Sequence, residues 1–504
     1  MTWIHPLSAE TEETPGVLGG KGHGLVVLRR LGLPVPPGFV IGTGACRAFL
    51  RDGRFPDGLD AELTAAVSAL EAATGRRFGG RERPLALAVR SGGSVSMPGM
   101  MNTILNLGLT AEAAAGLAAE TGDARFALDS RLRFLSGFAS AVAGEPVPDD
   151  AMRQLELAVG AVFSSWDTPR ATTYRELHGI PHELGTAVTV QAMVFGNRDD
   201  RSGAGVAFSR DPNTGERVPF GDVLFGRQGE DVVSGGSATR PLAELAGREP
   251  AVWAGLLEAM DRIEGHCRDA CQVEFTFEAG ALWLLQVRPG GLVGRAAVRV
   301  AVDLADEDLI SRREALLRVS PRHLRHASTP RIEITGTLDV LTRGLGACPG
   351  VAAGRVATTA ERAARMAADG PVILVRPQTS PLDMHGLAAA AGVVTALGGP
   401  ASHAAVVARA MGKPAVVGAA GLVVDVAAAT VRAGGRTVPE GTFLTIDGTG
   451  GEIVVGSPRV VTAPADVHLH RLLEWADEVT GGGDGAGHDD AERLAAARAV
   501  LLNA

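Results

Sequence analysis

The stretch GGPASHAAVVARAMGKPAVVG, residues 398–418, places a histidine between a glycine pair and a run of residues that favours a helix. Residues 404–411 contain no helix breaker, and Gly412 follows at the position where a left-handed glycine commonly ends a helix. Ser402 is a typical N-cap residue, which puts His403 at the first helical position. Unpaired backbone N–H groups and the positive end of the helix dipole favour an anion there. The stretch alone therefore fits either a phosphorylated histidine or an ordinary surface histidine near a helix start.

The composition is that of a large globular protein. The chain has 504 residues and a formal net charge of −9, without long blocks of one sign. This length predicts about three domains, and the charge argues against a surface for nucleic acid or for anionic membranes. The first thirty residues contain acids and glycines where a signal peptide needs an apolar core, and no later segment approaches a membrane span. We therefore expect a cytoplasmic protein that binds neither nucleic acid nor membranes.

The cysteines carry little functional information. The four of them, Cys46, Cys267, Cys271 and Cys348, are scattered and form no CxxC pair. Such spacing predicts reduced thiols rather than a disulfide framework.

The composition and hydrophobic pattern of the sequence divide the chain into four segments. Residues 1–295 alternate glycine-punctuated loops with short apolar runs and amphipathic helices, which predicts an α+β domain with ligand-binding loops. Residues 296–335 have a helical pattern and suit a linker. Residues 336–456 carry short β-like runs around the His403 helix and predict a compact α/β domain. Residues 457–504 form a C-terminal tail with helices.

Three glycine loops of the first segment each carry a cation: LGGKGHGL with Lys21, LAVRSGGSVSMPGMMNTILNLGL with Arg90, and LLQVRPGG with Arg288. Glycine lets backbone N–H groups approach a polyphosphate, and the cation neutralises its charge. Any one such loop is weak evidence. Together with LGLPVPPGF, RFALDSRLRFL, FSSWDTPRATTYRELHGI, QAMVFGN, GAGVAFSRDPNTGE and QGEDVVSG, in this order, the loops closely resemble pyruvate phosphate dikinase, a PEP-utilising enzyme family. The resemblance runs from about residue 18 to about residue 456.

The resemblance implies an α/β and α+β multidomain fold, with an ATP-grasp-type nucleotide-binding domain followed by a swivelling β/β/α phosphohistidine domain. The segment around His403 resembles the family's phospho-carrier motif. In that motif the histidine takes phosphate from ATP at one site, and the domain swings to deliver it elsewhere. A neutral imidazole is a good nucleophile near pH 7, which suits this chemistry. The resemblance therefore favours a phosphohistidine over a surface histidine.

The resemblance also implies binding residues. Lys21 and Arg90 match ATP-binding cations of the family, and Glu274 and Gln286 match its nucleotide and metal residues, where Mg²⁺ would bridge ATP oxygens. Arg133, Glu230 and Arg288 match positions that the family uses at the other end of the site, where orthophosphate accepts the terminal phosphoryl group. Arg133 also fits a plain cation on a helix surface.

The sequence departs from the family in several places. Members of the family continue into a large barrel that binds pyruvate and phosphoenolpyruvate, for which the present sequence has no counterpart. Gln272 and Asn102 each replace a usual Asp, and Leu397 replaces a common Arg just before the glycine pair. Ala401 replaces a usual Thr, so this position offers no hydroxyl for regulatory phosphorylation.

Three hypotheses remain open at this point. The first is an ATP-dependent phosphotransferase that phosphorylates His403 and passes the group to an unknown acceptor, one candidate being a separate barrel protein. The second is a small-molecule kinase comparable to the antibiotic-phosphorylating relatives of the superfamily. The third is a non-catalytic regulatory or binding paralogue, for which Gln272 and Leu397 are the best arguments. The intact cations and His403 favour the first hypothesis. Because the family's dimer contacts lie largely in the barrel, we expect a monomer or a weak dimer.

Overall fold

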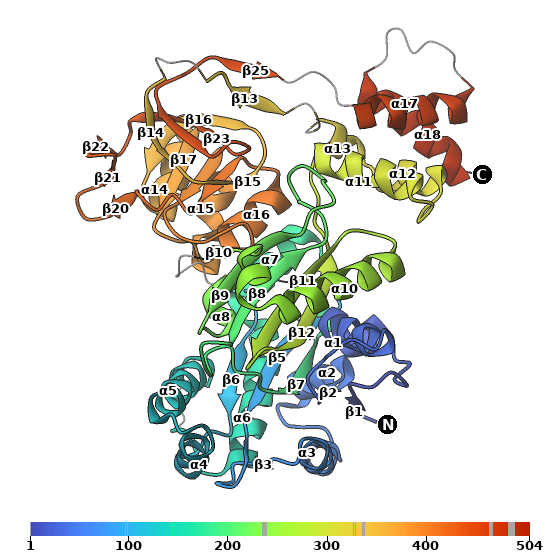
Figure 1. Cartoon of the computed structure of the whole chain (residues 1–504), viewed down its shortest axis with the longest axis vertical. Coiled ribbons are helices and arrows are strands. Elements are labelled where there is room, and N and C mark those ends of the chain that lie inside the picture. The colour runs from blue at the N-terminus through green and yellow to red at the C-terminus, as the bar shows by residue number, and fades with distance from the viewer. Residues whose placement is uncertain are drawn as a thin grey trace. The chain divides into compact units, whose positions relative to one another are not determined.

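The computed structural model describes residues 2–95, 97, 99–142, 144, 146–233, 239–325, 327, 329–334, 338–462, 467–481 and 489–503. Helices and sheets of mixed order confirm the expected α/β and α+β multidomain class (Figure 1). The chain divides into two compact units, Met1–Ser202 with Phe275–Val287, and Gly203–Glu274 with Arg288–Ala504. Residue 336, the expected start of the phosphohistidine domain, lies outside the described residues.

The first unit is built on an antiparallel sheet in the order β1-β2-β7-β5-β6. Its strands are β1 (Ile4–Pro6), β2 (Gly38–Ile41), β5 (Leu87–Gly93), β6 (Thr103–Leu107) and β7 (Thr186–Ala192), with a separate short pair, β3 (Arg77–Phe78) and β4 (Pro84–Leu85). Its helices are α1 (Pro15–Arg30), α2 (Thr43–Asp52), α3 (Leu59–Thr74), α4 (Ala111–Thr121), α5 (Ala124–Ala141), α6 (Ala151–Ser164) and α7 (Pro169–His178). Val89 and Val188 are fully buried in the core with Phe138 of α5. Because side chains alternate along a strand, Val89 in this core turns Arg90 to the other face of the sheet.

A second sheet has the order β10-β9-β8-β11-β12. Its strands are β8 (Gly203–Phe208), β9 (Phe220–Phe225), β10 (Arg240–Pro241), β11 (Cys271–Glu278) and β12 (Ala281–Pro289). The division between the units passes through β11 and β12. Helices α8 (Gly229–Val233), α9 (Glu244–Arg248) and α10 (Pro250–Cys267) belong to the second unit.

The histidine of the opening stretch lies in a part of the second unit that we call the carrier region, residues 338–462. An eight-stranded sheet has the order β14-β24-β23-β16-β17-β18-β19-β15, beside a three-stranded sheet β20-β21-β22 and the pair β13-β25. The strands are β13 (Pro330–Ile332), which precedes the carrier region, β14 (Val340–Arg343), β15 (Leu345–Cys348), β16 (Val351–Ala357), β17 (Val372–Arg376), β18 (Gly392–Thr395), β19 (Ala415–Val417), β20 (Val423–Asp425), β21 (Thr430–Ala433), β22 (Arg436–Pro439), β23 (Phe443–Asp447), β24 (Glu452–Val455) and β25 (Val460–Thr462). The helices are α14 (Ala360–Met366), α15 (Met384–Ala389) and α16 (His403–Met411).

Strands β17, β18 and β19 are parallel, and α16 connects β18 to β19. A helix that follows a parallel strand starts at the carboxyl edge of the sheet, where open α/β sheets bind their ligands. The strand residues Val394 and Val416 are fully buried in one apolar cluster, and Ala405 and Ala408 of α16 pack into another with Val417. This topology puts the start of α16 beside the ends of β17 and β18.

The remaining helices of the second unit share one apolar core. They are α11 (Arg295–Asp306), α12 (Arg312–Arg318), α13 (Pro321–Arg325), α17 (Val467–Thr480) and α18 (Asp490–Asn503). Buried residues from linker and tail, such as Val302, Leu316, Leu472 and Leu494, belong to the same cluster. The segments predicted as linker and tail therefore contribute to a common helical bundle.

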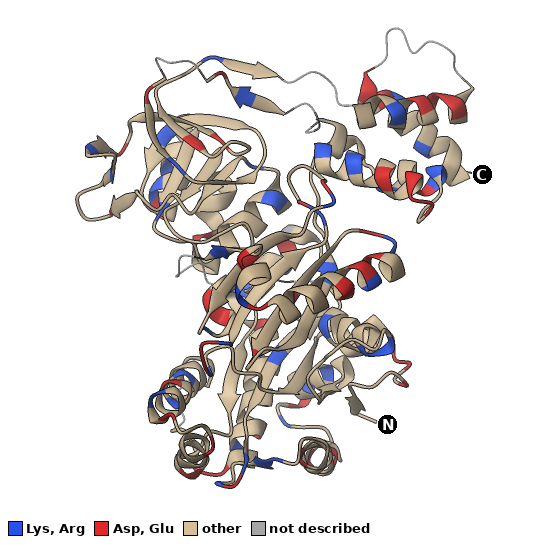
Figure 2. Cartoon of the chain, in the orientation of Figure 1, with Lys and Arg blue, Asp and Glu red and all other residues tan. Residues whose placement is uncertain are grey.

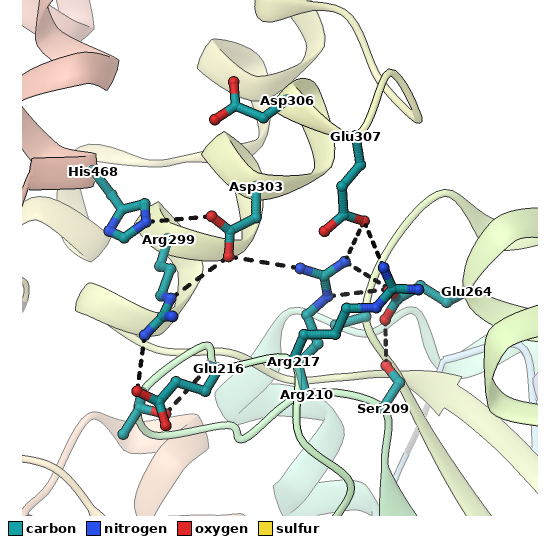
Figure 3. Close-up of polar contacts among 12 residues, drawn as sticks. Ser209, Arg210, Glu216, Arg217, Glu264, Arg299, Asp303, Asp306, Glu307 and His468 are labelled. Carbon is teal, nitrogen blue, oxygen red and sulfur yellow. Dashed lines mark hydrogen bonds and ion pairs between the residues drawn. The ribbon is translucent and has the colours of Figure 1, made fainter. Parts of the chain in front are cut away.

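A buried arginine fastens this bundle to the end of β8 (Figure 3). Arg210 is fully buried and donates to Glu264 Oε1 of α10 at 2.7 Å and to Glu307 Oε2, just after α11, at 2.9 Å. Asp303 of α11 lies 3.7 Å from Arg210 Nη1 and also pairs with His468 of α17 at 3.3 Å. Buried charges need such pairing because desolvation is costly, so this network ties the C-terminal end of α11 to α10 and to the end of β8.

Residues of both signs are interspersed over the helices and loops of the chain (Figure 2). Among the described residues, no helix is both long and apolar enough to cross a membrane.

Candidate phosphohistidine site

Helix α16 begins at His403 and ends at Met411, with Ser402 as N-cap and a left-handed Gly412 (φ 65°) as C-cap. This confirms the local prediction from the sequence. The N-cap backbone is extended (φ −65°, ψ 161°), so the chain enters the helix sharply. The imidazole therefore lies beside the first turn, where the helix dipole favours negative charge.

The ring of His403 is held on one side and has a buried nitrogen on the other. Its Nδ1 lies 3.1 Å from Thr379 Oγ1, which follows β17 and is 4% exposed. Its Nε2 is buried and has no hydrogen-bond partner in the described part of the chain. Burial lowers the pKa of His403, and the negative charge of Asp383 opposes this by a smaller amount. The ring is therefore neutral near pH 7, which leaves one nitrogen with a lone pair.

A small hollow beside the ring collects polar groups from the ends of β17 and β18. Its lining consists of Gln378, Thr379, Thr395, Leu397, Ser402, His403 and Ala404. Thr395 Oγ1 is already engaged, because it donates to Leu397 O at 2.8 Å. None of these lining residues is Lys or Arg, and Leu397 lines the hollow where the family resemblance suggested a cation.

The loop before His403 is fixed by a carboxylate from β9. Asp222 Oδ2 accepts from the backbone N–H of Ala401 at 2.9 Å, and Asp222 Oδ1 accepts from Thr239 Oγ1 at 2.9 Å. Asp222 is 3% exposed, and burial raises its pKa. A Cβ added at Gly399 would lie 2.1 Å from Asp222 Oδ1, so the glycine allows this close approach. The sequence interpretation missed Asp222; the signal was one acidic residue inside the apolar strand FGDVLF.

Arg409 fixes the same loop from within α16. Its Nη2 donates to Pro400 O at 2.7 Å and its Nη1 donates to Ala347 O at 3.0 Å. Burial lowers the pKa of this guanidinium to about 10, so Arg409 stays charged at neutral pH. It is a fixed cation held by backbone carbonyls behind the start of the helix.

The predicted residues of the first unit lie on α1, β5, α5 and β12. Lys21 follows a break in α1 at Gly19 (φ 67°), where a Cβ would meet Gly92 O at 1.7 Å. Arg90 is 8% exposed and donates to Gln191 Oε1 and, at 3.2 Å, to Leu285 O. Arg133 donates to Asp129 Oδ2 at 2.9 Å, one helical turn away. Gln286, on β12, is 7% exposed.

The predicted residues of the second unit include one direct pair. Arg288 Nη2 donates to Glu274 Oε1 at 2.9 Å, and the two side chains are 29% and 24% exposed. Glu230 lies on the short helix α8. The structure brings Arg288 and Glu274 together within the second unit.

A magnesium ion fits these residues only together with phosphate oxygens. The described residues contain no group of three or more His, Cys, Asp or Glu side chains arranged to hold a metal. Glu274 offers one carboxylate, already paired with Arg288. Mg²⁺ is commonly bound through one or two carboxylates plus substrate phosphates, so a nucleotide-bridged ion suits this donor set.

Two family models and several curated relatives match this chain. Residues 50–241 match the family model described as "Pyruvate phosphate dikinase, AMP/ATP-binding domain", and residues 368–451 match "PEP-utilising enzyme, mobile domain". The second match includes the His403 stretch. The chain is 40% identical to "Pyruvate, phosphate dikinase" of Rhizobium meliloti (strain 1021), over 94% of this chain and 60% of the relative. It is 41% identical to "Pyruvate, phosphate dikinase 2" of Zea mays, over 92% of this chain and 58% of the relative. The chain thus spans less than two thirds of the length of these relatives.

Proposed function

The chain belongs to the pyruvate phosphate dikinase family, and from this premise we propose that it uses ATP and orthophosphate to phosphorylate its own His403. The phosphoryl group then passes to a separate acceptor, either a protein or a small molecule. One observation carries the proposal: Nδ1 of His403 is held by Thr379, while Nε2 is buried without a partner among the described residues.

The contact with Thr379 engages Nδ1, which leaves Nε2 as the candidate nucleophile. When Nδ1 carries the proton and donates it to Thr379 Oγ1, Nε2 keeps its lone pair. Attack of this lone pair on the β-phosphorus of ATP forms the P–N bond, and the bond from the β-phosphorus to the oxygen shared with the α-phosphorus breaks, so that AMP leaves. Orthophosphate then attacks the γ-phosphorus, the bond from the γ-phosphorus to the oxygen shared with the β-phosphorus breaks, and pyrophosphate leaves. The β-phosphoryl group stays on His403.

We propose the nucleotide-binding residues from their match to the family. ATP contacts are assigned to Lys21, Arg90, Glu274, Gln286 and Arg288, and orthophosphate contacts to Arg133, Glu230 and Arg288. Glu274 and Gln286 would hold Mg²⁺, which neutralises charge on the phosphate oxygens when it is bound. The ion pair between Glu274 and Arg288 supports a shared role, because each side chain positions the other. We propose residues 1–295 as the nucleotide-binding domain and residues 336–456 as the phosphohistidine domain.

A regulatory paralogue is the competing function, and two residues favour it. Gln272 stands two residues before the proposed metal residue Glu274, and Leu397 lines the hollow beside His403. Both positions lack the charge that the family resemblance suggests there. Such a protein would bind nucleotide without transferring phosphate.

Product analysis separates these functions. Incubation with ATP, Mg²⁺ and orthophosphate is expected to release AMP and pyrophosphate in equal amounts, and His403→Ala should release neither. His385→Ala serves as matched control, because this histidine of the carrier region is half exposed on α15 and should leave the products unchanged. AMP without pyrophosphate would contradict the use of orthophosphate. Neither product from folded wild-type protein would favour the regulatory paralogue.

A further inference from the structure

Ser402 occupies the N-cap of α16 but does not cap the helix. Its side chain accepts no hydrogen bond from the backbone of the first turn. Thr359, the N-cap of α14 in the same region, behaves as expected and accepts from the backbone N–H of Arg362 at 3.2 Å. Serine is among the best N-cap residues because its oxygen satisfies an unpaired N–H group. The hydroxyl of Ser402 therefore makes no hydrogen bond to the backbone N–H groups of the first turn, its usual partners at an N-cap.

This hydroxyl is also buried. Ser402 is 3% exposed, and its Oγ has no hydrogen-bond partner among the described residues. Buried polar side chains are nearly always hydrogen-bonded, because an unsatisfied hydroxyl away from water destabilises the fold. An unsatisfied hydroxyl therefore requires an explanation, and a bound ligand supplies one.

The hydroxyl of Ser402 belongs to the hollow beside His403, where a phosphoryl group on the histidine would lie. Ser402 and His403 line the same hollow, and Nε2 of His403 is the second buried atom there without a partner among the described residues. The other two hydroxyls of the lining are engaged, Thr379 with the ring and Thr395 with the Leu397 carbonyl. The hydroxyl of Ser402 thus belongs to the same hollow as His403, whose Nε2 the proposed function makes the nucleophile.

We propose that Ser402 Oγ–H donates a hydrogen bond to a phosphoryl oxygen carried on His403 Nε2. This role rests on the proposed function, since it needs a phosphoryl group on that nitrogen. A hydroxyl that donates to a charged oxygen forms a short, strong hydrogen bond. Because the lining of the hollow contains no Lys or Arg, Ser402 and the start of α16 supply the stabilisation that a cation would otherwise give.

Ser402→Ala tests the role with two readouts, phosphoenzyme chemistry and thermal stability. Loss of a hydrogen bond to a charged group is expected to slow labelling from β-³²P-ATP, or to shorten the half-life of the isolated phosphoenzyme, by about tenfold to a hundredfold. The melting temperature should not fall, because no cap bond is lost. Thr359→Ala is the matched control: it removes a real cap, so it should lower the melting temperature and leave labelling and half-life unchanged.

Each outcome bears on the proposal. Wild-type labelling rate and half-life in Ser402→Ala would overturn it, and so would a fall in melting temperature as large as that of Thr359→Ala, which would reveal an ordinary cap. Failure of the proposed function gives a different result, because the wild-type protein itself would then take up no label. That result would also rule out the proposed role of Ser402.

Discussion

Asp222 Oδ2 accepts a hydrogen bond from the backbone N–H of Ala401 at 2.9 Å, two residues before His403. The carboxylate comes from β9, which lies 179 residues earlier in the chain. A strand of the second sheet thus holds the loop that presents the histidine. Gly399 and Arg409 complete this arrangement, the first by leaving room for the carboxylate and the second by holding Pro400 O.

Asp222→Ala should slow phosphorylation of His403, because the loop loses a charge-assisted bond that contributes about 1.5–3 kcal/mol. The expected result is a labelling rate about tenfold to a hundredfold lower. Asp425→Ala is the control, since Asp425 also accepts from a backbone N–H in the carrier region, that of Ala428 at 2.9 Å, but in an exposed turn. Equal rates for the two variants would show that the Asp222 contact does not serve the histidine.

Gly399→Ala should impair labelling even though it adds one methyl group. The new Cβ would lie 2.1 Å from Asp222 Oδ1, so the loop or the carboxylate must move. Gly265→Ala in α10 is the control: it meets no atom within 4 Å, and alanine should stabilise the helix by up to about 1 kcal/mol. Normal labelling of Gly399→Ala would contradict the close contact.

The pH dependence of the His403 ring follows from its burial. The pKa of His403 is lowered, so the neutral nucleophile persists as pH falls through the ordinary histidine value of about 6.5 and is lost only below it. Because the unfolded chain binds this proton more readily, the same group makes the fold less stable as pH falls from about 6.5 toward the lowered pKa. Histidine-selective NMR titration, with His403→Ala to assign the signal, should place the midpoint of His403 below the ordinary histidine value of about 6.5. A midpoint for His403 at or above 6.5 would contradict the burial argument.

The sequence predicted local features of the site, such as the limits of α16, and missed the contacts that come from distant parts of the chain. The limits of α16, its N-cap and its C-cap follow from a few neighbouring residues, and the structure confirms them. Thr379 and Asp222 were missed because they reach the site from 24 and 179 residues away, through the sheet order rather than through any motif. Sequence pattern also treated the linker and the tail as separate segments. The apolar face of each of these helices could pack against many other elements, so the sequence pattern does not show which one it contacts. In the fold, the helices of the linker and of the tail pack into one core.

Arg210→Met should destabilise the protein far more than loss of an exposed pair. Arg210 is fully buried against Glu264, and removal of one partner of a buried ion pair costs about 3–5 kcal/mol. Arg54→Met is the control, because its pair with Asp57 is exposed and such pairs contribute about 0–1 kcal/mol. Chemical denaturation measures both. A loss in Arg210→Met no larger than in the control would show that the network does not fasten the bundle.

The central claim is that His403 receives the β-phosphoryl group of ATP, and labelling of the protein tests it most directly. Folded wild-type protein with β-³²P-ATP, Mg²⁺ and orthophosphate should acquire an acid-labile, base-stable label on the peptide that contains His403. His403→Ala should acquire none, and His385→Ala should be labelled like wild type. Absence of this label from the wild-type protein, or label that persists in His403→Ala, would contradict the account.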